Sequence, residues 1–177
     1  IQRQSPDAYH TADVAARQGR DSYWHSLSIS LGARLCRNDI RSLLAEPGAG
    51  CSMDGLYMAD GDRHVDHHTT IDHAAPHTTS HELYKGILGG RATGVFNGKV
   101  IVRNEGQKTD SAQLNKNLLL SGGATINTKP QLEIFADDVR CSHGATTGRL
   151  DEEAIFFLRA RGIDAARPQE EDRLLVE

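Results

Sequence analysis

The chain has 177 residues, of which 38% are hydrophobic and 5% aromatic, and its formal net charge is -4. The 20 basic and 24 acidic residues are scattered, so there is no cationic stripe to neutralise nucleic acid, and no run of about 18 apolar residues that predicts a membrane span. The chain has three cysteines, Cys36, Cys51 and Cys141. A secreted disulfide framework would need more cysteines and an even number of them. We therefore expect a cytoplasmic protein that binds neither nucleic acid nor membrane.

Plentiful glycine and few aromatic residues favour a chain of many short β-strands joined by turns. Residues 1–25 are polar without a sustained period, and we expect them to form an irregular N-terminal edge. From residue 26 to 31 polar and apolar side chains alternate strictly, which predicts a half-buried strand. Further strands are predicted at residues 56–58, 64–71, 83–88, 95–96, 99–103, 117–121, 131–135 and 139–143.

The strongest apolar clusters, at residues 100–102, 118–120 and 132–134, recur at intervals of roughly 15 to 20 residues, near the coil length of solenoid repeats. This recurrence predicts a right-handed parallel β-helix, an all-β single-stranded solenoid in which each coil stacks on the last. Locally, Asn97-Gly98 is equally compatible with the two-residue turn of a β-hairpin. That alternative stays open at the level of the sequence.

One helix is predicted at the C-terminal end, over residues 151–161. Asp151 is placed to cap it, acidic residues occupy its first turn, and Gly162 follows its last. We expect its apolar side chains to dock on the end of the β-domain, because an open terminal coil exposes unpaired strand edges. The predicted organisation is a β-helix core over residues 26–148 and a helical segment over 149–177. The abrupt ends of the sequence indicate a truncated chain.

Histidine is concentrated in one segment, with aspartates among the histidines, and this combination is typical of zinc or non-haem iron sites. The H-E-x-x-H spacing is missing, and adjacent strand residues point to opposite faces. We therefore expect an outward-facing surface without a catalytic metal. The rival interpretation is an enzyme similar to a polysaccharide lyase that uses this face. The six histidines of the segment are His64, His67, His68, His73, His77 and His81.

A second candidate site is the sequence C-S-H-G-A-T at residues 141–146. On a strand, Cys141 and His143 project from the same face, so a thiolate and an imidazole could both bind one soft metal or one cluster iron. The alternative is structural, because a lone cysteine is often a core residue and Val139 has the same parity. No nucleophile elbow or phosphate-binding loop occurs, and we do not expect an enzyme.

About two thirds of the chain resembles the SufB/SufD family of iron–sulfur cluster assembly scaffolds, and the C-S-H-G motif is similar to its SufD branch. The resemblance rests on a series of motifs that runs through the predicted β-domain into the helix. They are H-T-T-S at 77–80, Y-K-G-I-L at 84–88, V-F-N-G-K at 95–99, Q-K-T-D at 107–110, Q-L-N at 113–115, N-L-L-L-S at 117–121, T-K-P-Q-L-E-I at 128–134, A-D-D-V at 136–139, C-S-H-G-A-T at 141–146 and F-L-R-A-R-G-I at 157–163.

The resemblance implies a noncatalytic scaffold of the SUF system, a right-handed parallel β-helix that pairs with a SufB-like subunit. It further implies that C-terminal helices bind a SufC-like ATPase and that an iron–sulfur cluster forms transiently at the subunit interface, with none in the isolated chain. His143 matches the family histidine near that cluster, and Cys141 matches the cysteine beside it. Without the SufB-like partner we expect a homodimer through residues 139–143. A purely architectural subunit without cluster ligands is the remaining alternative.

Overall fold

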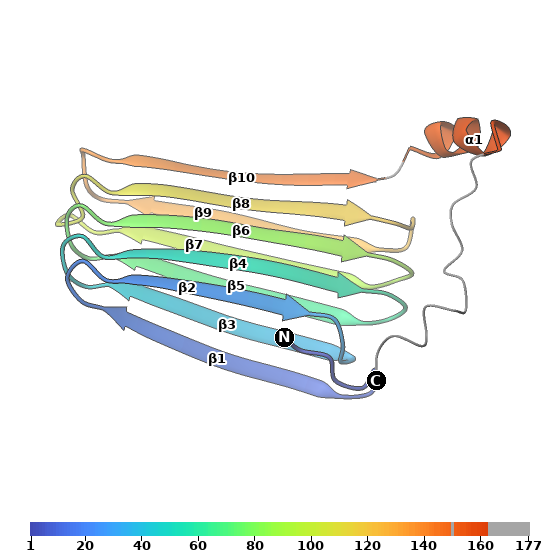
Figure 1. Cartoon of the computed structure of the whole chain (residues 1–177), viewed down its shortest axis with the longest axis horizontal. Helices are drawn as coiled ribbons and strands as arrows, with labels where there is room; N and C mark the ends of the chain where they lie inside the picture. Colours follow the sequence, from blue (N-terminus) through green and yellow to red (C-terminus); the bar gives the residue numbers. More distant parts are fainter. Residues whose placement is uncertain (150, 163–177) are drawn as a thin grey trace.

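The computed structural model describes residues 1–149 and 151–162. Ten strands build almost all of this part of the chain, and one helix, α1 (Glu152–Ala160), follows them (Figure 1). In chain order the strands are β1 (Tyr9–Gln18), β2 (Tyr23–Ser30), β3 (Leu35–Leu44), β4 (Gly50–Ala59), β5 (His64–His73), β6 (Thr79–Leu88), β7 (Thr93–Val102), β8 (Asp110–Leu119), β9 (Thr125–Ile134) and β10 (Arg140–Arg149).

The strands form two sheets that face each other. The odd-numbered strands make one sheet in the order β1-β3-β5-β7-β9, and the even-numbered strands make the other in the order β10-β8-β6-β4-β2. All neighbours within a sheet are parallel, and paired residues are 26 to 32 positions apart in the sequence. Five coils of two strands each therefore stack into a parallel β-solenoid, which confirms the predicted fold class.

The spacing between apolar clusters in the sequence corresponds to half a coil. The clusters at residues 100–102, 118–120 and 132–134 lie near the ends of β7, β8 and β9, which alternate between the two sheets. The prediction of about 15 to 20 residues per coil is therefore too short. The two half-coils look alike in sequence because each supplies one strand with the same inward-facing apolar pattern.

The hairpin interpretation of Asn97-Gly98 is wrong, because both residues lie within β7. Gly98 faces the interior, where a Cβ atom would stand 2.5 Å from Nε2 of Gln113 and 2.7 Å from the Phe96 ring. The glycine is required here by the close approach of these two side chains, and it forms no turn.

The prediction of an irregular edge over residues 1–25 is also wrong, because β1 begins at Tyr9 and β2 at Tyr23. These strands belong to the first coil, which has a neighbouring coil on only one side. Val14 consequently keeps 43% of its surface exposed, and it is the single large aliphatic residue of β1. For this reason the alternation of polar and apolar residues is weak in an end coil. The β1 backbone nevertheless pairs with β3 along its full length.

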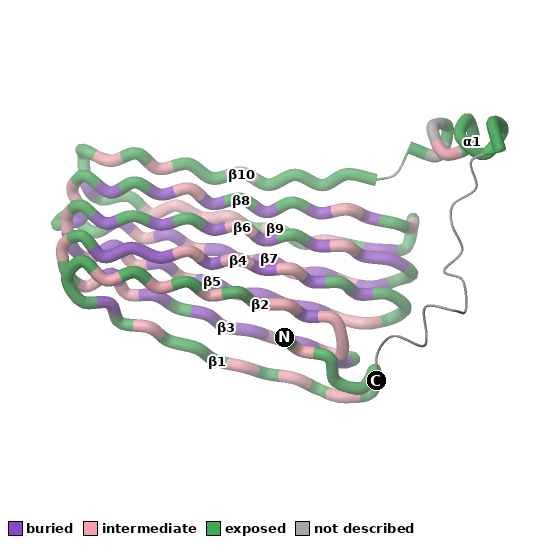
Figure 2. The backbone as a smooth tube through the Cα atoms, viewed as in Figure 1, coloured by how far each residue is buried: buried purple, intermediate pink, exposed green. Residues whose placement is uncertain are grey.

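The core lies between the two sheets, where inward positions alternate with outward ones along each strand (Figure 2). The largest fully buried side chains include Tyr57 and Tyr84. Each ring lies against a glycine of an adjacent coil: a Cβ atom would overlap Tyr84 at Gly55 and Tyr57 at Gly86. Large and small residues thus alternate up the stack, which fills the interior without strain.

The predicted helix is confirmed in α1. Its first turn is capped by Asp151, whose Oδ1 atom accepts the Glu153 backbone N–H at 2.9 Å, and Gly162 follows with a φ of 78°. The expected docking is wrong, because Phe156, Phe157 and Leu158 are 74%, 54% and 46% exposed. No helix in the described ranges is long and apolar enough to cross a membrane. Residues 163–177, predicted to belong to the helical segment, lie outside the described residues.

Candidate functional site

Cys141 and His143 lie on β10, the last strand of the even-numbered sheet. In the parallel register Cys141 is the neighbour of Ser111 on β8, and His143 is the neighbour of Gln113. Ser111 and Gln113 are both buried between the sheets. Because neighbours in register share a face, Cys141 and His143 both point to the interior side of the sheet.

No further coil covers this side within the described residues, and Figure 2 shows that β10 is largely exposed. Cys141 is half-buried and packs against the core, whereas His143 is exposed. Burial and, secondarily, the nearby Asp110 carboxylate raise the pKa of the Cys141 thiol. The thiol is therefore protonated at neutral pH, and it must lose a proton before it can bind a metal.

Below Cys141 runs a chain of buried hydroxyl groups. Ser111 hydrogen-bonds Ser80 at 2.8 Å, and Ser80 hydrogen-bonds Nε2 of His73 at 2.9 Å. Nδ1 of His73 is bonded to Thr78 at 2.8 Å. Both ring nitrogens of His73 are thus satisfied, and burial lowers its pKa to about 4. This histidine is a neutral member of a structural network that ends beneath the thiol.

Below His143 lies a second polar column. Gln113 donates from Nε2 to Oε2 of Glu82 at 2.6 Å, and both side chains are fully buried. Burial raises the pKa of Glu82 to about 7. Met53 continues the column on β4. Cys141 and His143 therefore each lie next to buried polar side chains of the two preceding coils of the same sheet.

The polar stacks were not found by sequence analysis, although the signal is present in the sequence. Glu82, Gln113 and His143 pair successively in register at separations of 31 and 30 residues. Ser80, Ser111 and Cys141 repeat the same separations. A search at the true coil length would have aligned both columns, whereas the half-coil interval places successive members on opposite sheets.

The histidine-rich segment is not the outward surface that we expected. His67 and His73, on β5, are fully buried. The His67 ring stacks on Tyr57 at 5.2 Å and meets Tyr84 at 5.3 Å between ring centroids, and burial lowers its pKa to about 4. The prediction is wrong for these two residues: aromatic rings surround the neutral imidazole of His67, and hydroxyl groups satisfy both ring nitrogens of His73.

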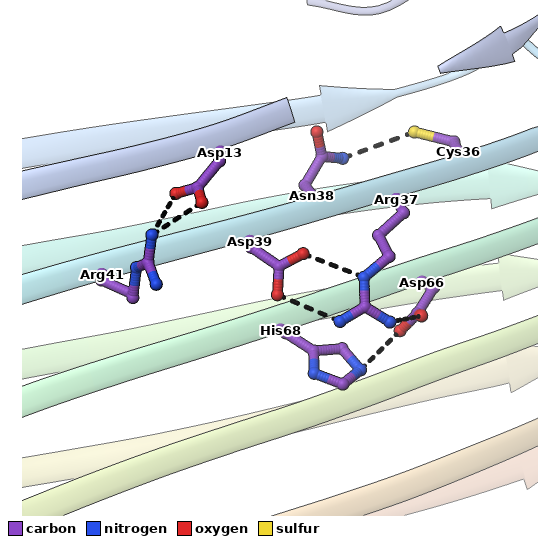
Figure 3. Close-up of polar contacts among 8 residues, drawn as sticks. All are labelled: Asp13, Cys36, Arg37, Asn38, Asp39, Arg41, Asp66 and His68. Atoms are coloured by element: carbon purple, nitrogen blue, oxygen red, sulfur yellow. Dashed lines mark hydrogen bonds and ion pairs between the residues drawn. The ribbon is translucent and has the colours of Figure 1, made fainter. Parts of the chain in front are cut away.

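Two residues of this segment, Asp66 and His68, belong to an ion-pair network on the odd-numbered sheet (Figure 3). Arg37 contacts Asp39 through two hydrogen bonds of 2.9 and 3.1 Å and Asp66 through one of 2.7 Å, while His68 lies 3.0 Å from Asp66. The hydrogen bond from Arg37 is the largest cause that lowers the pKa of Asp39. A carboxylate held in this way is a poor general base, which argues against a lyase-like enzyme on this face.

No group of three His, Cys, Asp or Glu side chains that could hold a metal ion occurs in the part of the chain that the structure describes. The candidate pair on β10 therefore offers at most two ligands from its own chain. A four-coordinate iron would need its other ligands from a cluster sulfide or from another subunit.

The fold and the site define a parallel β-solenoid whose last described coil carries a thiol and an imidazole on its inner side. In a comparison with protein families, the family model described as "SUF system FeS cluster assembly, SufBD core domain" matches residues 1–176. The chain belongs to the SufB/SufD family of iron–sulfur cluster assembly proteins.

Relatives include an iron–sulfur cluster assembly SufBD family protein of Synechocystis, 40% identical over 163 residues. The iron–sulfur cluster assembly protein SufD of Escherichia coli is 36% identical over 167 residues, and the chloroplastic protein ABCI7 of Arabidopsis thaliana is 34% identical over 165 residues. These matches cover 92%, 94% and 93% of the chain and 36%, 40% and 35% of the respective relatives. The chain thus spans well under half the length of these proteins.

Proposed function

We propose that this chain is a SufD-like, noncatalytic scaffold subunit that helps to build and transfer iron–sulfur clusters in the cytoplasm. The observation that carries the proposal is the last described coil, where Cys141 and His143 face inward and no coil of the described residues covers them. The family membership and the likeness to a protein named SufD support the same assignment. The cluster is the cargo of this site and no resident cofactor.

The chemistry of the two side chains suits a transient cluster at a subunit interface. A neutral imidazole at His143 and a thiolate at Cys141 are both ligands that iron accepts. Two ligands are too few for a closed site, so the remaining coordination would come from a SufB-like partner. Because burial raises the pKa of the Cys141 thiol, binding through this residue would release a proton and weaken as the pH falls.

The last coil also supports pairing with another subunit. β10 and β9 are the terminal strands of their sheets, and their outer edges carry backbone groups that another β-solenoid could pair with. We propose a SufB-like subunit as the partner, with a second copy of this chain in its place when the partner is missing. The exposed Phe156, Phe157 and Leu158 of α1 offer an apolar surface for a SufC-like ATPase.

Replacing His143 by alanine in the complex with both partners tests the proposal. We expect cluster assembly to fall by more than about tenfold, since loss of an outer-shell partner alone costs about 10- to 100-fold at metal sites. The complex should keep its composition and its melting temperature, because His143 is exposed. The readout is the visible absorption of the cluster after anaerobic supply of iron and sulfide.

His81→Ala is the matched control, because His81 is also exposed and also lies on the even-numbered sheet. It should assemble clusters at the wild-type rate. Normal assembly by the His143→Ala complex would contradict the proposed site and leave the purely architectural role in its place.

A further inference from the structure

Glu82 and Gln113 form a buried pair that the packing of the solenoid does not explain. Their side chains are 1% and 0% exposed, and they share a hydrogen bond of 2.6 Å. Oε1 of Gln113 has no hydrogen-bond partner among the described residues. A buried polar atom without a partner destabilises the folded chain, so a buried amide oxygen of this kind indicates a role beyond packing.

The Gln113 amide is held in one orientation. Its nitrogen donates to Glu82 in the coil below, and the same nitrogen lies close to Gly98 of β7, where any Cβ atom would stand 2.5 Å away. A side chain at position 98 would displace the amide. With the nitrogen committed to Glu82, the oxygen is the part of the amide left to accept a hydrogen bond.

His143 is the next residue of this column. It is paired in register with Gln113 and belongs to the same inner side of the sheet. Neighbouring strands lie about 4.8 Å apart, which brings an imidazole N–H within hydrogen-bonding reach of an amide oxygen one strand below. The His143 ring is exposed in this chain.

We propose that Gln113, anchored by Glu82, is a positioning residue for His143: it accepts one ring N–H, fixes the tautomer, and leaves the other nitrogen free to bind iron. The inference rests on the proposed function of His143 as a ligand. A histidine that binds a metal typically donates its second ring N–H to a carboxylate or carbonyl group, and the Glu82–Gln113 pair supplies that acceptor from the buried interior.

The anchor works in both ionisation states of Glu82. Burial raises the pKa of Glu82 to about 7, so both forms are present at neutral pH. Each form keeps an oxygen that can accept the Gln113 N–H. The Gln113 amide therefore keeps its orientation on both sides of neutral pH, and its oxygen remains available to accept a hydrogen bond from His143.

The test is the nitrogen NMR spectrum of the His143 ring in the purified chain at about pH 8.5, above the ordinary imidazole pKa. Loss of signals in His143→Ala identifies the ring. In the wild type we expect one protonated and one bare nitrogen of a single tautomer. Gln113→Met introduces an unbranched side chain of similar length without an acceptor oxygen. In this variant the nitrogen signals of His143 should move to the positions of the signals from the exposed His81 ring in the same spectrum.

Ser111→Ala is the matched control, since Ser111 is the neighbouring buried residue beneath Cys141. It should leave the His143 ring signals unchanged. An unchanged His143 spectrum in Gln113→Met, or an equal change in Ser111→Ala, would overturn the proposal. If Gln113→Met does not fold, Gln113→Asn takes its place; it keeps the amide but shortens the reach, and unchanged signals there would equally overturn it.

The complex with both partners gives the second readout. Gln113→Met should assemble clusters about 10- to 100-fold less well, the usual effect of losing an outer-shell partner. Normal cluster assembly by the His143→Ala complex would contradict the proposed function, but the ring spectrum would still test the positioning role. An unchanged His143 ring spectrum in Gln113→Met would contradict only the positioning role.

Discussion

The middle coils and the last coil of this solenoid carry the same inward-facing pattern but bury it to different degrees. In one column Met53, Glu82 and Gln113 are fully buried, and the next residue, His143, is exposed. The difference shows that burial at an inward position is supplied by the coils on both sides. An end coil therefore leaves interior positions accessible, and a reactive side chain can be placed there at little cost in stability.

The largest expected effect is in the middle of the stack. Phe96 is fully buried and lies 5.1 Å from the Tyr84 ring, so Phe96→Ala should lower the free energy of unfolding by about 3 to 5 kcal/mol in urea titrations. Leu132, in the last coil, is half-buried, and Leu132→Ala should cost less than about 2 kcal/mol. Equal losses at the two positions would contradict the comparison.

Glycine positions should separate the same two regions with a smaller effect. An alanine at Gly86 would overlap the Tyr57 ring, and overpacking of this kind costs about 1 to 3 kcal/mol. Nothing lies within 4 Å of a Cβ atom at Gly148 on β10, so Gly148→Ala should change stability by less than about 0.5 kcal/mol. Thermal unfolding of both variants measures the contrast, and a destabilised Gly148→Ala would show that β10 is packed more tightly than it appears.

Stability should depend on pH through the buried core. In the folded chain the pKa values of His67 and His73 are lowered to about 4. The contribution of these neutral histidines to stability is therefore complete above about pH 6.5 and is lost as the pH falls towards 4. Glu82 acts in the opposite sense: its pKa is raised from 4.5 to about 7, so its contribution is complete below pH 4.5 and is lost as the pH rises through 7.

Glu82→Gln isolates the carboxyl contribution. Relative to the wild type, this variant should become progressively more stable as the pH is raised from 4.5 to 8, because it has no proton to lose. Urea unfolding at the two pH values measures the difference. Glu133→Gln replaces a carboxyl whose side chain is 44% exposed and pairs with Lys99, and it serves as the control. A trend of the same size in both variants would contradict the buried-acid interpretation.

A small effect is expected at Cys141. The side chain is half-buried at the open end, so Cys141→Ser should lower the free energy of unfolding by less than about 1 kcal/mol. Cluster assembly should fall less than in His143→Ala, because part of the role of Cys141 is to pack against the core. A loss of assembly greater than that of His143→Ala, measured in the same complex, would make the thiol the principal ligand.

Local sequence patterns predicted much of the fold, and they failed where burial depends on stacking. Alternation at residues 26–31 indicated β2 correctly, and the capping residue Asp151 indicated α1. β3 was not predicted, because its alternating positions include Asn38 and Ser42, polar residues that are buried by coils above and below. A polar side chain in a solenoid core is visible only when the neighbouring coils are aligned.

The sequence by itself determined the class of fold, the terminal helix and the placement of Cys141 and His143 on one face of a strand. Only the tertiary structure decided that a coil contains two strands, that His67 and His73 are core residues, and that Gln113 and Glu82 lie beneath His143. The physical reason is the range of the interactions. Strand parity and helix capping act over a few residues, whereas register between coils joins residues about 30 positions apart and is fixed by the packing of whole coils.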